Sequence, residues 1–148
     1  MFAQVITVVV SALAATAVAT DAVAPRETYG NWAGKQFVEE CTDTSCIAKF
    51  NVGTAAKYYK DAPGFTVKCQ STQNEANWAP CEVVGAKTEG ADISSVWTKA
   101  SADDKIKLSV SHAWNGADGA RYNATGTAEF KKGETSFNMP VVKVTAVL

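Results

Sequence analysis

The feature that most constrains this chain is a pair of cysteines that bounds a short polar stretch between two strand-like runs. Phe65, Val67 and Cys69 alternate with polar residues, which is the period-two pattern of a half-buried strand. A second short run begins at Cys81. A disulfide between the two cysteines closes a loop of about 13 residues, worth roughly 3 kcal/mol in the chain-entropy model. We therefore expect the rest of the chain to be organised around residues 65–84.

The chain has four cysteines, and an even number is typical of paired disulfides in an exported domain. We favour the pairs Cys69–Cys81 and Cys41–Cys46, because each is local and separated by turn-forming residues. The main alternative pairs Cys46 with Cys69 and Cys41 with Cys81. A zinc site is disfavoured, because C-x4-C followed by C-x11-C lacks the paired short spacings of structural zinc domains. We expect no metal and no cofactor.

The first twenty residues carry no charged side chain and have a long apolar middle. Small-x-small sites follow, which end at Ala17 and Ala19. We predict a secretory signal peptide over residues 1–19, cleaved after Ala19, with cleavage after Ala17 as the alternative. Residues 20–34 are then expected to form a loose N-terminal leader. Residues 35–148 are expected to form one disulfide-stapled β domain.

The charges of the chain are balanced, with 14 basic and 15 acidic residues, all of them beyond Thr20. The two signs are interspersed along the sequence rather than gathered in blocks. This pattern gives no electrostatic footprint for nucleic acid or for an anionic membrane. We therefore expect no nucleic-acid partner and no membrane insertion.

Short period-two runs separated by turn residues continue to the C-terminus, without an amphipathic helix of ten residues. We predict an all-β fold: a single-domain antiparallel β-sandwich or squat β-barrel of about seven to eight strands. Gly126, inside one run, predicts a bulge or bend. Pro140 predicts that the last strand begins after it or lies at an edge. The expected strands are 36–40, 46–52, 65–70, 82–85, 93–99, 105–114, 121–130 and 141–148.

Few residues are suited to catalysis. His112, the only histidine, alternates with Leu108 and Val110, and we interpret it as a hydrogen-bonded core residue. The sequence has no G-x-S-x-G elbow and no H-E-x-x-H motif. No spacing brings two carboxylates together as a glycosidase requires. We predict that the protein is not an enzyme, and keep a small secreted hydrolase as a less favoured alternative.

The four tryptophans, Trp32, Trp78, Trp97 and Trp114, stand near predicted strand ends or loops. Amphipathic rings at such places commonly seal a small core, and this is the interpretation that we favour. The alternative is a flat platform on which sugars stack, which would make the protein a carbohydrate- or cell-wall-binding module.

One N-glycosylation sequon is present, Asn123-Ala-Thr125. By alternation with Tyr122, the side chain of Asn123 is predicted to point outward. We therefore predict Asn123 as the glycosylation site.

The order of the motifs resembles a known family. The succession is C-x4-C-x3-F-x-V, F-x-V-x-C, W-x-x-C and I-x-L-x-V, followed by a glycine-rich turn and an aromatic strand. It is similar to small secreted fungal proteins known as hypersensitive-response-inducing elicitors or cell-death-inducing effectors. The block from Phe65 to Cys81 is also similar to the Alternaria major-allergen family of β-barrel effectors. This chain departs from the allergen family because no cysteine follows Cys81.

The resemblance implies a fungal extracellular protein that binds a host extracellular or membrane protein and triggers or modulates plant defence and cell death. A cell-wall polysaccharide is the alternative partner. Because rigid scaffolds commonly bind through their loops, we expect contacts in residues 70–80, 87–92 and 115–119. The candidate partner-binding residues are Asn77, Trp78, Trp114, Asn115 and Asp118.

Overall fold

The structure, a computed structural model, describes residues 28–148. The predicted signal peptide (1–19) and most of the predicted leader (20–34) lie outside the described residues. The described part of the chain consists of strands and turns, and contains no helix long and apolar enough to cross a membrane. The strands are β1 (Asn31–Cys41), β2 (Cys46–Thr54), β3 (Phe65–Thr72), β4 (Ala79–Pro80), β5 (Glu82–Val83), β6 (Asp92–Thr98), β7 (Lys105–Asn115), β8 (Arg121–Lys131) and β9 (Phe137–Val147).

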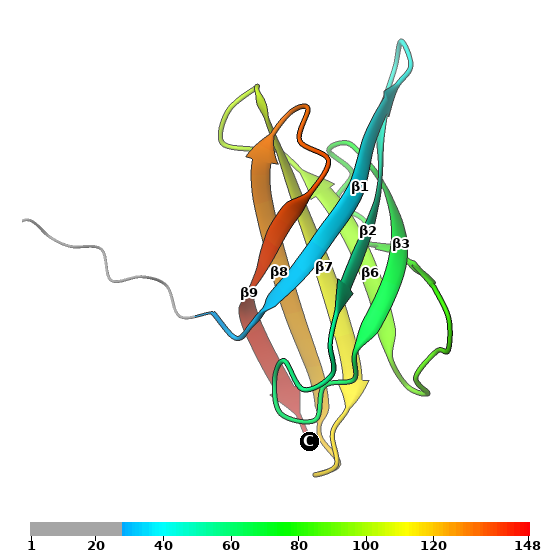
Figure 1. The fold of residues 1–148 in the computed structure, drawn as a ribbon, viewed down its shortest axis with the longest axis vertical. Helices are drawn as coiled ribbons and strands as arrows, with labels where there is room; N and C mark the ends of the chain where they lie inside the picture. The colour runs from blue at the N-terminus through cyan, green and yellow to red at the C-terminus, as the bar shows by residue number, and fades with distance from the viewer. Residues whose placement is uncertain (1–27) are drawn as a thin grey trace, which may run out of the picture.

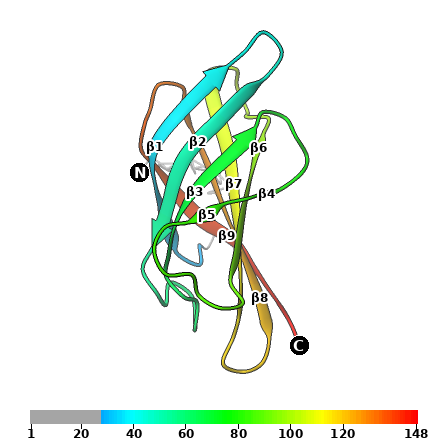
Figure 2. The same cartoon turned by 90° about the vertical axis from the view of Figure 1, so that its right-hand side faces the viewer.

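All nine strands belong to one antiparallel sheet, in the order β4-β6-β7-β8-β9-β1-β2-β3-β5. Figures 1 and 2 show this sheet folding back on itself, with β1, β2 and β3 on one side and β6, β7 and β8 on the other. The result is a nearly closed barrel, so the all-β prediction is confirmed in its barrel form. The strand beyond the predicted seven to eight is the short segment β4, whereas β5 lies within the predicted strand 82–85.

The barrel closes between β3 and β6 through the segment 79–84. On one side, Ala79 pairs with Ser95 of β6, and the backbone N–H of Cys81 donates to the carbonyl of Ile93 at 2.9 Å. On the other side, Val83 pairs with Val67 of β3. One short segment thus satisfies backbone groups on both edges of the curled sheet.

Side chains join the same two strands. The disulfide Cys69–Cys81 ties β3 to the closing segment. Inside the barrel, the hydroxyls of Ser71 on β3 and Ser95 on β6 lie 2.7 Å apart in a buried hydrogen bond. The seam is therefore held by a covalent bond and a buried polar contact as well as by backbone pairing.

Both favoured disulfides are present, Cys69–Cys81 and Cys41–Cys46, and the alternative pairing is wrong. The described residues contain no free cysteine. The second bond closes the tip of the β1–β2 hairpin, where Cys41 and Cys46 are direct partners in the sheet register. Two such bonds are typical of a protein that folds in an oxidising compartment.

The predicted leader is shorter than expected, because β1 begins at Asn31 and not near residue 36. Trp32 is the reason. Its ring is fully buried, packed against Phe65 at 5.2 Å between ring centroids, and its backbone pairs with Met139 of β9. Burying a side chain of this size stabilises the fold enough to hold the preceding backbone in the sheet.

The last strand also differs from the prediction, because Pro140 lies inside β9 and not before it. Pro140 faces Asn31 of β1, and the next residue, Val141, is where β9 begins to pair with β8. Proline cannot donate a backbone hydrogen bond. Pro140 therefore lies where β9 changes its partner from β1 to β8.

The bend predicted at Gly126 is confirmed as a break in the β8–β9 register, with Val142 as the extra residue. A Cβ atom at Gly126 would lie 2.7 Å from the ring of Trp32 and 2.9 Å from the side chain of Met139. The absence of a side chain here is what allows Trp32 to pack against β8.

Substituting Gly126→Ala is expected to lower the free energy of unfolding by about 1–3 kcal/mol, the usual cost of overpacking a core. Chemical denaturation measures it, with Thr125→Ala, on the outer face of the same strand, as the matched control. Equal stability of the two variants would contradict the packing described for Trp32.

Removing the two disulfides is expected to have unequal effects. Replacing Cys69 and Cys81 by Ala should cost about 3 kcal/mol, against about 2 kcal/mol for Cys41 and Cys46, because the first loop is longer. The difference should widen further, since Cys69 is 3% exposed and leaves a cavity, whereas Cys41 is exposed. Urea unfolding of the two double variants tests this order, and the reverse order would refute it.

Candidate functional site

Two of the three predicted binding loops meet at one end of the barrel, the lower end in Figure 1. Arg121, the first residue of β8, joins them. Its guanidinium donates to Asp92 Oδ2 at 2.9 Å, to Asn115 Oδ1 at 3.0 Å and to the carbonyl of Gly90. The loop before β6 and the turn after β7 are therefore fastened to one cation.

A second group of polar side chains continues this surface. The hydroxyl of Tyr122 donates to Asp118 Oδ2 at 2.5 Å, and the Lys60 ammonium donates to the hydroxyl of Tyr122 at 3.4 Å. The hydrogen bond from Tyr122 lowers the pKa of Asp118, and the hydrogen bond to Tyr122 raises the pKa of Lys60. An anion and a cation are thus held side by side.

We call this surface the loop face; it comprises Lys60, Asp92, Asn115, Asp118 and Arg121. Its members come from the β2–β3 loop, the start of β6, the end of β7, the β7–β8 turn and the start of β8. All are exposed to solvent at least in part. Fixed charges and an amide, held in place by one another, suit recognition of a polar protein surface.

The five candidate partner-binding residues do not form one site. Asn115 and Asp118 lie in the loop face. Asn77 and Trp78 lie at the opposite end, since the residues after β3 run beside the end of β6, as the Gln73–Trp97 bridge shows. The loop there also begins later than predicted, because residues 70–72 belong to β3.

The prediction for Trp114 as a contact residue is wrong. Trp114 is 1% exposed and lies between the rings of His112 and Tyr122, with centroids 5.0 and 5.4 Å away. It seals the core, as do Trp32 and Trp97, and the interpretation favoured for the tryptophans is confirmed for these three. Trp78 is the exception, with 44% of its surface exposed.

His112 is confirmed as a hydrogen-bonded core residue. It is fully buried, and its Nδ1 lies 2.8 Å from the hydroxyl of Tyr58. Burial, with a smaller contribution from Arg121, lowers the pKa of His112 to about 4, and burial also raises the pKa of Tyr58. The imidazole is therefore neutral at neutral pH, and the tyrosine keeps its proton.

The other ring nitrogen of His112, Nε2, has no hydrogen-bond partner among the described residues. His112 lines a cavity of about 20 Å³ together with Phe65, Val83 and Ile93. A space of this size holds about one water molecule, so it is too small for a substrate.

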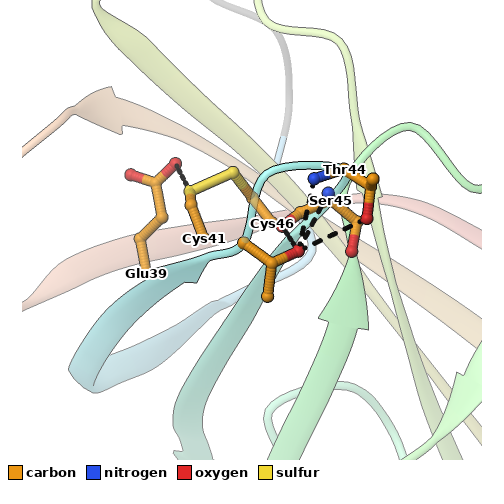
Figure 3. Close-up of a disulfide and its surroundings, with 6 residues drawn as sticks. Glu39, Cys41, Thr44, Ser45 and Cys46 are labelled. Carbon is orange, nitrogen blue, oxygen red and sulfur yellow. Dashed lines mark hydrogen bonds between the residues drawn. A yellow bond between two sulfur atoms is a disulfide. The ribbon is translucent and has the colours of Figure 1, made fainter.

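One cluster has the composition of a metal site: Glu39, Cys41 and Cys46 (Figure 3). Glu39 Oε1 lies 3.6 Å from Sγ of Cys41. Both sulfurs belong to the disulfide, so neither is a thiolate that could ligate a metal or a thiol that could donate a hydrogen bond. The cluster is the disulfide that closes the β1–β2 hairpin, with one carboxylate beside it.

The sequon residue Asn123 is exposed on β8, pointing outward as its alternation predicts. Its Oδ1 accepts a hydrogen bond from the hydroxyl of Ser111 at 2.8 Å, and its amide nitrogen donates to none of the described residues. The position is compatible with glycosylation, and occupancy of the site stays a prediction.

Sequence reasoning missed two members of the loop face, Lys60 and Arg121, whereas Asp92 belongs to the predicted binding loop 87–92. Arg121 had a signal: it follows the Asn-Gly and Asp-Gly turn and pairs directly with Asn115 in the hairpin register. Nothing local identifies Lys60, because its place depends on how distant loops meet.

The fold and these contacts define a small disulfide-closed β-barrel with a polar end. No protein-family model, no curated protein and no solved structure matches the chain. The resemblance to fungal elicitors therefore stays a prediction from the sequence.

Acidification is expected to destabilise the protein through His112. The pKa of His112 in the folded protein, about 4, lies below the ordinary histidine pKa of 6.5, so on acidification the unfolded chain takes up this proton at a higher pH than the folded protein. The neutral imidazole therefore contributes about 3 kcal/mol to the free energy of unfolding above pH 6.5. This contribution is lost as the pH falls from 6.5 through about 4. Denaturant unfolding across this range measures it.

His112→Gln provides the control, since glutamine can bond Tyr58 but does not titrate. The variant should be less stable at neutral pH and show a shallower loss between pH 6.5 and 4 than the native chain. An unchanged slope would show that His112 is not the responsible group.

Proposed function

We propose that this protein is a secreted, non-catalytic effector that acts outside the cell on a plant host. It binds a host extracellular or membrane protein and thereby triggers or modulates defence and cell death. The host and the response come from the resemblance to fungal elicitors. The observation that carries the binding role is the loop face, where Arg121 fastens Asp92 and Asn115 on a rigid barrel.

The composition of the loop face supports binding to a protein. Arginine is enriched at energetically important positions of interfaces, and the partly exposed Arg121 stands at the centre of the loop face. Because the side chains are already held by hydrogen bonds, little conformational entropy is lost when a partner binds. Both signs of charge are present, which favours a partner of matched pattern over any polyanion or polycation.

The state of the reactive residues supports a non-catalytic role. His112 is buried and hydrogen-bonded to Tyr58, and all four cysteines are in disulfides. At the loop face, the two carboxylates, Asp92 and Asp118, are engaged by Arg121 and Tyr122. The histidine and the cysteines therefore stabilise the fold, and the two carboxylates present charge at the surface.

Infiltration of the purified, oxidised protein into leaf tissue tests the proposal. The native protein is expected to provoke cell death or a defence response. Reversing the exposed charge in Lys60→Glu should raise the dose for half-maximal response about tenfold, the effect of losing about 1.4 kcal/mol of binding. Lys132→Glu, an exposed charge at the opposite end of the barrel, is the matched control.

Two results would overturn the proposal. Absence of any response to the native protein would contradict the effector role. Equal doses for half-maximal response with Lys60→Glu and Lys132→Glu would show that the loop face is not the contact surface. Tyr58→Phe, which deletes the hydroxyl that bonds His112, should leave the response intact. Loss of response in a folded Tyr58→Phe protein would favour catalysis instead.

A further inference from the structure

A second polar surface lies on the wall of the barrel, away from the loop face. Two adjoining hollows of about 410 and 370 Å³ run over the outer side of β1, β2 and β3 and share Gln36 and Asn51. We call them together the wall groove. Its polar lining includes Lys35, Gln36, Asn51, Lys68, Gln70 and Glu82.

A β-bulge shapes this groove. The register of β1 against β2 shifts between Lys35 and Val38, and Gln36 has a left-handed backbone with φ 54°. Lys35 and Gln36 are consequently both exposed, although they are consecutive in a strand. This conformation costs a residue other than glycine about 1–2 kcal/mol. Bulges that re-aim a side chain in this way are concentrated at functional sites.

The bulge brings an amide pair to the centre of the groove. Asn51 Nδ2 donates to Gln36 Oε1 at 2.5 Å. The Oδ1 of Asn51 and the Nε2 of Gln36 stay available, so the pair offers one acceptor and one donor with fixed positions. Paired groups of this kind match the hydroxyls of a sugar ring, which both donate and accept.

Two lysines flank the amides. In the sheet register Asn51 is the direct partner of both Lys35 on β1 and Lys68 on β3. The two lysine backbones are therefore about 10 Å apart, twice the spacing of neighbouring strands. Neither ammonium takes part in an ion pair among the described residues, whereas Lys49, which also lines the groove, is paired with Glu40 at 2.7 Å.

From these contacts we propose that the wall groove binds an acidic oligosaccharide, a chain of sugar rings that carry carboxylates. Lys35 and Lys68 pair with carboxylates, while Gln36 and Asn51 bond ring hydroxyls. No exposed aromatic ring lines the groove, so recognition depends on charge and amides and not on stacking against neutral sugars. Glu82 stands beside Lys68 in the register and disfavours a dense polyanion such as nucleic acid.

The test uses calorimetric titration of the native protein with oligogalacturonate, a chain of uronic acids, at low and at physiological salt. Binding is expected, and it should weaken as salt rises. The same chain with its carboxylates methyl-esterified should bind at least about tenfold more weakly, as expected when two exposed charge pairs are lost. Equal binding of the esterified chain, or no binding of either, would overturn the proposal.

Variants locate the site. Lys35→Ala with Lys68→Ala should weaken binding about tenfold, whereas Lys132→Ala with Lys143→Ala, two exposed lysines elsewhere, should not change it. Gln36→Gly, which removes the amide and relieves the left-handed strain, should weaken binding while leaving the protein as stable or more stable. Undiminished binding by the first double variant would place the ligand elsewhere.

Two further probes test specificity. Chitin oligomers and duplex DNA should each bind more weakly than oligogalacturonate, and equal or tighter binding of either would refute the assignment. Lys60→Glu, at the loop face, should leave oligosaccharide binding unchanged. Failure of this inference is thus distinguishable from failure of the proposed effector role, which is read out in leaf tissue.

Discussion

The structure depends on how the two edges of its curled sheet are joined. An antiparallel sheet that folds back on itself leaves unpaired backbone on its first and last long strands, here β6 and β3. The segment 79–84 pairs first with β6 and then with β3, and the disulfide Cys69–Cys81 keeps it in place. The inward side chains of β3 and β6 at this seam, including the hydrogen-bonded Ser71 and Ser95, are enclosed by its closure. The loop that the two cysteines bound is therefore the part of the barrel wall that turns an open sheet into an enclosed core.

Much of this could be predicted from local patterns. Alternation along residues 105–114 is enough to place His112 inward, and the same alternation places Asn123 outward. The disulfides were predictable because each joins cysteines close in sequence and separated by turn residues. The start of β1 was not predictable, because Trp32 is buried by pairing with Met139, a residue far along the chain. Contacts at such separation leave no mark in a local pattern.

The candidate binding residues show where local reasoning was incomplete. Trp114 continues the inward series Ile106, Leu108, Val110 and His112, so the alternation of the strand already indicated that it is buried. Its position beside a turn suggested exposure instead. Assigning Lys60 to the loop face required the assembled barrel, because Lys60 lies in the β2–β3 loop, which meets the other loops only in the folded structure. Arg121, which was not predicted, had a readable signal, its register with Asn115 across the hairpin.

Balanced composition concealed the charge pattern that the sheet creates. Lys35 and Lys68 are distant in sequence, with charges of both signs between them. The net charge of the chain therefore gives no sign that they lie together. In the barrel they stand on either side of Asn51, while Lys49 is neutralised by Glu40. A net charge near zero therefore excludes a large uniform field, and it does not exclude a small site of one sign. Because the loop face lies at an end of the barrel and the wall groove on its side, the two surfaces share no residue. Substitutions in one surface therefore leave the residues of the other in place, so the two proposed roles are tested by separate variants.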